Sequence, residues 1–280
     1  MALRRGLAFL LAFFCLAALR PLPTARGEED SVRRERALLI GVDEFVTQPS
    51  AYPSSTNNVY AMQEMFQAAA EPLEKILVPD APVTSAQQLT ELIQRVFGGA
   101  EAGDVSYLYI STHGLYDPEN GVEPALLLSD GQTENHLTPE ELEAAFDGIS
   151  GTKVLILDAC NSGAFIGKGM TEWDEPPCFL GDDFKVITSS GAREESWYWS
   201  AGEDAKQEER QGAFYFTQAL CDALSAACGY PADQNHDGSI TLKELYDYLL
   251  LNHAASTPQV YPQNDDDFVI FRYDPSEPLP

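Results

Sequence analysis

The chain has 280 residues, of which 44% are hydrophobic and 22% charged, and its formal net charge at pH 7 is −27. This composition is that of a globular protein with one large core, and no shift in composition along the chain marks a second independent domain. The strong negative charge argues against a nucleic-acid partner, because surfaces that bind nucleic acid are basic.

Residues 1–27 have the pattern of a secretory signal segment. Arg4 and Arg5 precede an apolar run over Gly6–Leu19, and Ala25-Arg26-Gly27 offers small residues at a cleavage site. The apolar run is short for a membrane span. We therefore expect a secreted or extracytoplasmic mature chain, residues 28–280, that forms one domain without a stable span. A retained amino-terminal anchor is the alternative.

The first part of the mature chain alternates predicted strands and helices. In chain order we expect a strand over Arg36–Val42, a helix over Asn57–Ala70 capped by Thr56, a strand over Lys75–Val78, a helix over Ser85–Phe97 and a strand over Val105–Thr112. This alternation predicts a largely parallel sheet covered by helices on both faces, an α/β fold.

The second part continues the same pattern with longer loops. We expect a hairpin at Ala125–Ser129 with Asp130-Gly131, a helix from the capping box at Thr138 to Phe146, a strand from Lys153, a mobile loop over Gly163–Gly181, a strand over Asp183–Ser190, an aromatic-rich loop over Gly191–Gly212, helices over Phe214–Ala227 and Leu242–Leu251, and a last strand in FVIFRY, residues 268–273.

A thiol follows the most apolar of these strands. In KVLILDACNSGA, residues 153–164, the buried run ends at Cys160, and side-chain alternation places Asp158 and Cys160 on the same side of the sheet. Open α/β sheets bind ligands at this carboxyl edge. A buried structural cysteine is the alternative. However, His113 ends another predicted strand at the same edge, 47 residues before Cys160.

The motifs YISTHG and LDACNSG resemble the caspase-haemoglobinase group of cysteine peptidases, which includes caspases, metacaspases, legumain, clostripain and gingipains. The resemblance implies a caspase-like three-layer sandwich with a mostly parallel six-stranded sheet and helices on both faces. It also implies peptide hydrolysis by a dyad, with Cys160 as nucleophile and His113 as general acid and base. The amides of Gly114 and Cys160 are candidates for the oxyanion hole.

Asp158 is the candidate for substrate specificity. A carboxylate at this position is costly to bury without a partner, and a substrate Arg or Lys could supply one. The resemblance agrees, since metacaspases carry Asp two residues before the cysteine and prefer Arg or Lys, whereas caspases carry Gln. Alternatively, Asp158 accepts backbone amides and orders the loop. Ser190, at the end of its predicted strand, is a second candidate substrate-binding residue.

A second motif lies at residues 233–244, DQNHDGSITLKE. Its spacing and chemistry match an EF-hand calcium loop, with a glycine at position 6. The expected ligands are Asp233, Asn235, Asp237, the carbonyl of Ser239, Thr241 and Glu244. An acidic turn without metal is the alternative. If calcium binds, the lone loop favours a structural or activating ion over a paired sensor.

The leading hypothesis is thus a secreted cysteine endopeptidase that cleaves peptides or proteins after Arg or Lys. A non-enzymatic, calcium-dependent binding module on a peptidase-like fold is the alternative, and it would predict that the His or the Cys is missing. Both are present. A nucleotide-binding domain would need a glycine-rich phosphate loop after the first strand, which the sequence lacks.

Overall fold

A computed structural model describes residues 33–168, 178–202, 211–253 and 255–276. Its centre is a six-stranded sheet with the order β12-β8-β7-β3-β1-β2. These strands are β1 (Glu35–Gly41), β2 (Lys75–Leu77), β3 (Val105–Ser111), β7 (Thr152–Asp158), β8 (Phe184–Thr188) and β12 (Gln259–Tyr261). The first five in chain order pair in parallel, and β12 is antiparallel to β8. The predicted mostly parallel six-stranded sheet is confirmed.

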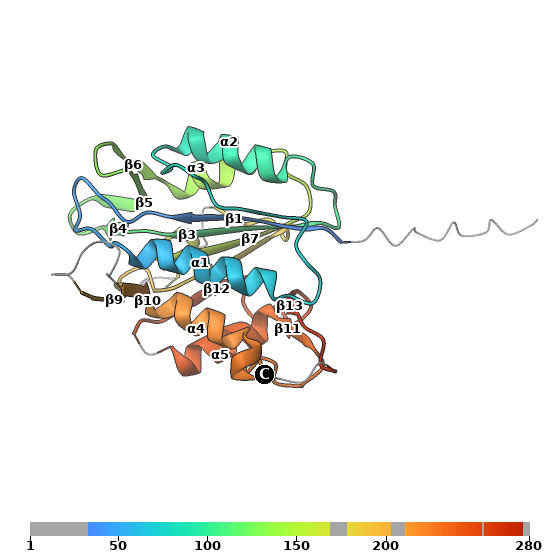
Figure 1. Ribbon diagram of the computed structural model, residues 1–280. Coiled ribbons are helices and arrows are strands. Elements are labelled where there is room, and N and C mark those ends of the chain that lie inside the picture. The colour runs from blue at the N-terminus through green and yellow to red at the C-terminus, as the bar shows by residue number, and fades with distance from the viewer. Residues whose placement is uncertain (1–32, 169–177, 203–210, 254, 277–280) are drawn as a thin grey trace, which may run out of the picture. The chain divides into compact units, whose positions relative to one another are not determined.

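Side-chain alternation along each strand feeds two separate cores. In β1, Leu38 and Ile40 face one apolar cluster, whereas Ala37 and Leu39 face the other. Helices α2 (Ala86–Phe97) and α3 (Pro139–Ala144) cover the first face; α1 (Ser54–Gln67), α4 (Tyr215–Ala223) and α5 (Leu242–Asn252) cover the second, as Figure 1 shows. Both faces of the sheet are therefore shielded from water, as expected for strands that are apolar on both sides.

Most helices begin where the capping residues predict. Ser85 accepts a hydrogen bond from the amide of Gln88 at the start of α2, and Thr138 and Glu141 form a capping box on α3. Helix α1 differs, because it begins at Ser54, before Thr56. The carboxylate of Asp43, in the preceding loop, accepts from the amides of Ser55 at 2.8 Å and Thr56 at 3.0 Å. A cap supplied from outside the helix leaves no local sequence pattern.

Two small sheets flank the carboxyl edge of the main sheet. One contains β4 (Gly114–Asp117), β5 (Val122–Ser129) and β6 (Glu134–Leu137), so the predicted hairpin at Asp130-Gly131 is confirmed and gains a third strand. The other pairs β9 (Tyr198–Ala201) with β10 (Gln211–Phe214). The prediction of an irregular loop over 191–212 was wrong there, because aromatic residues on two paired strands stabilise a ribbon.

The carboxyl-terminal region also departs from the prediction. Helix α4 ends at Ala223, and a 3-10 turn over Ala226–Cys228 follows it. The predicted last strand leaves the main sheet: β13 (Val269–Arg272) pairs antiparallel with β11 (Ser239–Thr241), and β12 occupies the sheet edge instead. The start of the predicted loop after Cys160 is a buried 3-10 turn, Ser162–Ile166.

Some predictions fall on residues that the structure does not describe. The signal segment 1–27 and residues 169–177 of the predicted mobile loop lie outside the described residues. Among the residues that are described, no helix is both long and apolar enough to span a membrane.

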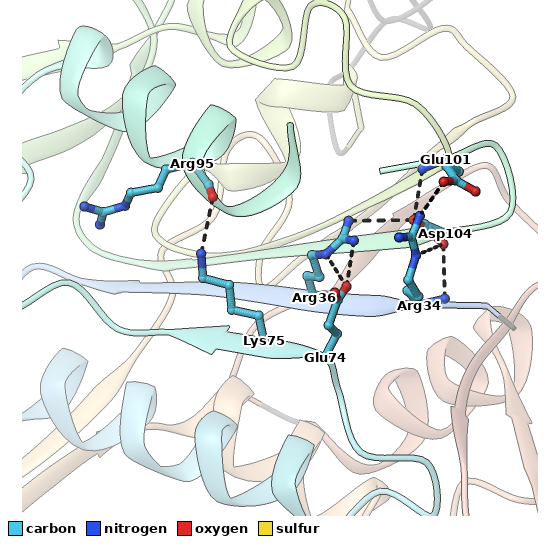
Figure 2. Close-up of polar contacts among 7 residues, drawn as sticks. All are labelled: Arg34, Arg36, Glu74, Lys75, Arg95, Glu101 and Asp104. Carbon is cyan, nitrogen blue, oxygen red and sulfur yellow. Dashed lines mark hydrogen bonds and ion pairs between the residues drawn. The ribbon is translucent and has the colours of Figure 1, made fainter. Parts of the chain in front are cut away.

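A group of charged side chains joins β1 to the segment before β3 at the amino edge of the sheet (Figure 2). Arg34 binds Asp104 through Nη2 at 2.8 Å and through its own backbone amide at 3.1 Å. Arg36 binds Glu74 at 2.6 Å and lies 3.7 Å from Asp104. Burial alone would raise the pKa of Asp104, but the Arg34 and backbone hydrogen bonds lower it below its ordinary value. Asp104 is therefore ionised and paired.

We predict that Asp104→Asn lowers the free energy of unfolding at pH 7 by about 2 kcal/mol, because it removes the buried carboxylate that Arg34 and Arg36 share and leaves them only Glu101 and Glu74. The stabilisation from Asp104 exists above its unfolded pKa and is lost as pH falls through the lower, folded pKa. Urea unfolding should show the difference between wild type and variant at pH 7 and a decrease of that difference as the pH is lowered below about 4. Glu101→Gln, at an exposed partner of Arg34, is the control and should cost under about 1 kcal/mol.

Candidate active site

The two motif-bearing strands are neighbours in the sheet. Strand β3 pairs in parallel with β7 so that Ser111 lies opposite Asp158, and the amide of Thr112 donates to the carbonyl of Asp158 at 3.1 Å. His113 and Cys160 each follow the end of their strand at this edge. A Cβ placed on Gly114 would lie 1.8 Å from the carbonyl oxygen of Cys160. Only glycine permits this close approach, which packs the histidine motif directly against the cysteine motif.

The imidazole of His113 is held by the loop between β1 and α1. Its Nε2 lies 3.0 Å from the carbonyl oxygen of Pro49, and its ring centroid lies 4.5 Å from that of Phe45. A carbonyl only accepts, so Nε2 carries the hydrogen and Nδ1 is left to take up a proton. Burial lowers the pKa of His113, while the Pro49 carbonyl and the charge of Glu134 act to raise it.

The thiol of Cys160 is half-buried and contacts one residue twice. The amide of Ser196 donates to Sγ at 3.3 Å, and Sγ lies 3.5 Å from the carbonyl oxygen of the same residue. Burial raises the pKa of Cys160; the Ser196 amide opposes this, and the charges of Glu195 and Asp158 add to it. Because the pKa of the thiol is raised and that of the imidazole lowered, the resting pair is a neutral thiol and a neutral imidazole.

Asp158 is the last residue of β7 and is 0% exposed. Its Oδ1 accepts from Ser196 Oγ at 3.0 Å and its Oδ2 from Thr217 Oγ1 at 2.7 Å. Because Thr217 uses its only hydrogen on Asp158, the hydroxyl of Tyr109, 2.6 Å away, donates to Thr217. Burial raises the pKa of Asp158 to about 6, against the opposing effect of these hydroxyls. Through Ser196, Asp158 also anchors the loop that touches the thiol.

Ser190 holds the turn that carries the nucleophile. Its Oγ donates to the carbonyl of Ala159 at 3.0 Å and accepts from the amide of Ser162 at 3.3 Å, and its side chain is fully buried. The neighbouring Ser189 Oγ accepts from the amide of Ala159 at 3.0 Å. In this structure the Ser190 side chain therefore stabilises the backbone turn that contains Cys160.

Sequence reasoning missed several contributors to this site, and two of them form hydrogen bonds with His113 or Cys160. Pro49 acts through its carbonyl, which every residue type has, so no side-chain signal marks it. Ser196 contacts the thiol through its backbone and Asp158 through its hydroxyl. The sequence analysis predicted only an aromatic-rich loop in this segment, and that pattern does not mark the serine.

The geometry is that of a thiol and an imidazole at the carboxyl edge of a parallel sheet, and the family comparison agrees with it. The model of the caspase domain matches residues 34–247 of the chain. The chain belongs to the caspase-domain family.

Comparison with solved structures supports the fold of this caspase domain. A crystal structure of caspase-1 from Spodoptera frugiperda is similar to it, with a TM-score of 0.50 and 16% sequence identity over 81% of this chain and 86% of that chain. At this identity the likeness shows the fold alone. No curated protein matches the chain in the sequence comparison.

The acidic loop of this caspase domain, residues 233–244, is a series of turns closed by hydrogen bonds from its own backbone amides. The carboxylate of Asp233 accepts from the amides of His236 at 2.7 Å and Gly238 at 3.0 Å. Gly238 has a φ of +85°, which a residue with a side chain rarely adopts. Asp233, one of the predicted ligands, is thus hydrogen-bonded to backbone amides of the same loop.

The donor set of this loop is only partly assembled for a metal. Glu244 accepts from the amide of Thr241 at 2.9 Å and so caps α5, while the hydroxyl of Tyr273 donates to Asp233 at 2.7 Å. In the part of the chain that the structure describes, no three His, Cys, Asp or Glu side chains are close enough together to hold a metal ion. The oxygen donors at residues 233–237 are of the chemical type that calcium takes, and Glu244 could join them only after turning away from Thr241.

The burial of Asp158 should be visible in the pH dependence of stability. Because its folded pKa is raised to about 6, protonation stabilises the fold below the unfolded pKa near 3.8, and this contribution is lost as pH rises through 6. A shift of this size corresponds to about 3 kcal/mol. We predict that Asp158→Asn removes this decline in unfolding free energy between pH 4 and pH 7. Asp80→Asn, at an exposed residue, should keep it; pH curves of the Asp158 variant that run parallel to wild type would contradict the assignment.

Proposed function

We propose that this caspase domain is a cysteine endopeptidase in which Cys160 is the nucleophile and His113 the general acid and base. The observation that supports this most is the in-register pairing of β3 with β7, which brings the two motifs together at one sheet edge. The close contact of Gly114 with Cys160 supports it further. A domain that had lost its activity would not need both reactive groups at this edge.

The proposed reaction begins from the neutral pair. His113 takes the thiol proton on Nδ1 as Sγ attacks the scissile carbonyl carbon, and backbone amides stabilise the oxyanion; those of Gly114 and Cys160 are our candidates. The C–N bond then breaks, the amine leaves with the proton from His113, and a thioester remains on Cys160. Water, deprotonated by His113, hydrolyses the thioester and restores the thiol.

We further propose a preference for Arg or Lys before the scissile bond. Asp158 lies on the nucleophile's side of the sheet, and within the described residues no lysine or arginine pairs with it. With a pKa of about 6, this buried carboxyl group is mostly ionised at neutral pH. A substrate cation would compensate that charge better than hydroxyl groups alone.

We also propose that the protein is secreted. The pattern of residues 1–27 supports removal of a signal segment and an extracytoplasmic mature chain. Its substrates would then be extracellular peptides or proteins with exposed basic residues.

We predict that Cys160→Ala abolishes hydrolysis of fluorogenic Arg and Lys peptides while the protein stays folded, because it removes the acyl-bearing atom and little volume. Cys228→Ala, at an exposed thiol, is the matched control and should keep wild-type rates. Rates should be measured across a library that varies the residue before the cut. Wild-type hydrolysis by Cys160→Ala would refute the nucleophile, and a preference for Asp or Asn would refute the basic specificity. A folded wild type without activity on any peptide would favour the binding-module alternative.

We also propose that residues 233–244 bind one calcium ion. The spacing of the oxygen-bearing residues and the turn at Gly238 support this. The protein ligands of the ion would be Asp233, Asn235, Asp237, the carbonyl of Ser239, Thr241 and, after its side chain turns, Glu244. Because β11 of this loop pairs with β13 and α5 follows directly, an ion there would fix these elements against each other.

For this loop we predict a rise in melting temperature when calcium is added. Ligand binding to the native state alone contributes about 2.7 kcal/mol at a free concentration one hundred times the Kd. The double variant Asp233→Ala, Glu244→Gln should lose the rise, and Gln keeps the capping acceptor of α5. Asp80→Asn serves as the control. A melting curve that neither calcium nor a chelator moves, together with no heat of binding, would identify the loop as an acidic turn.

A further inference from the structure

The loop over residues 43–51, which carries the groups that hold His113, is closed at its base. The amide of Ala51 donates to the carbonyl of Asp43 at 2.8 Å, and the Asp43 side chain binds the start of α1. Beyond this base, the loop extends to the surface, where Val46 is 54% exposed. Because this tip is exposed, it buries little apolar surface, and other contacts must hold it in one conformation.

A residue of the sheet formed by β4, β5 and β6 holds this tip in place. Glu134, on β6, accepts from the amide of Val46 at 2.7 Å and from the amide of Thr47 at 3.4 Å through Oε2. Its Oε1 accepts from the hydroxyl of Thr47 at 2.5 Å. Within the described residues, the hydrogen bonds that Val46 and Thr47 donate all end on this carboxylate. One side chain therefore binds the tip at three donors.

The same tip contacts the imidazole of His113 through residues that precede and follow Val46 and Thr47 in the chain. Phe45 immediately precedes Val46, and its ring is tilted by 58° against that of His113. Pro49, two residues after Thr47, contributes the carbonyl oxygen at 3.0 Å from Nε2. Glu134 thus fixes the stretch of chain between the two groups that set the orientation and tautomer of the ring.

We propose that Glu134 is a positioning residue for His113, acting through the loop over residues 43–51. The proposal rests on the function proposed for His113 and adds to it a residue on a separate sheet. It also gives β4, β5 and β6 a role: they present the carboxylate that holds the histidine loop. Surface hydrogen bonds that only stabilised the hairpin would leave the imidazole unaffected, and this difference can be measured.

Two variants of Glu134 separate its hydrogen bonds from its charge. Glu134→Ala removes all three bonds. Glu134→Gln can still accept from both amides through its oxygen and donate to the Thr47 hydroxyl through its nitrogen. Only the charge, which raises the pKa of His113, is lost in Glu134→Gln. His136, on the same strand, is the other titratable group that acts on Glu134. Glu123→Ala, at an exposed acid on β5, is the matched control.

We expect Glu134→Ala to lower kcat by tenfold to a hundredfold with little change in KM, since a displacement of about 1 Å in a catalytic group can cost two orders of magnitude. Glu134→Gln should keep most of kcat. Thr47→Val, which removes one of the three bonds, should give a smaller loss. Unchanged kcat in Glu134→Ala, or an equal loss in Glu123→Ala, would overturn the proposal, and so would failure of Glu134→Gln to restore kcat.

A readout without substrate separates this proposal from the peptidase assignment. In protein labelled with ¹³C-histidine, the His113 signal, assigned by its absence in His113→Gln, should shift and titrate differently in Glu134→Ala. In Glu134→Gln its chemical shift at high pH should stay near that of wild type while its pKa falls. An unchanged His113 signal in Glu134→Ala would refute the positioning role whether or not the protein cleaves peptides. If Glu134→Ala does not fold, the signal of the milder Thr47→Val decides in the same way.

Discussion

Everything at the candidate site depends on the parallel pairing of β3 with β7. The register that places Ser111 opposite Asp158 ends both strands at the same level, so the residues that follow them share one edge. A slip of one residue would turn Asp158 to the opposite face and separate it from Thr217. The apolar character of both strands fixes this register, because each of their faces is buried against its own cluster of side chains.

The two edges of the sheet use aspartate in opposite ways. At the amino edge, Asp104 meets the guanidinium groups of Arg34 and Arg36, and its pKa is lowered despite its burial. At the carboxyl edge, Asp158 meets neutral hydroxyls, and its pKa is raised to about 6 because they do not compensate full burial. The first arrangement adds to stability at neutral pH, whereas the second detracts from it. An uncompensated charge persists where a ligand can supply the missing partner, as we propose for a basic substrate.

Neither reactive group is oriented by its strand alone. His113 is held by a loop that precedes α1 and that is itself tied to β6, and Cys160 is held by Ser196 from the loop after β8. The strands bring the dyad together, and the loops set its detailed geometry. Since loop segments have lower local stability than core strands, substitutions in them can alter turnover without lowering the overall stability.

The sequence by itself determined the five parallel strands of the sheet, because short apolar runs that alternate with amphipathic helices are typical of strands buried on both faces. It also placed Cys160, His113 and Asp158 by the strands that they end. The capping box at Thr138 and the hairpin at Asp130-Gly131 were equally readable, since their signals lie within a few neighbouring residues. Only the tertiary structure decided that Asp43 caps α1, that Pro49 contacts His113, that Ser196 contacts Cys160 and that β13 leaves the main sheet for β11. Backbone carbonyls and amides are the same in every residue, and contacts between segments distant in the chain depend on the packing of both, so no local pattern could reveal them.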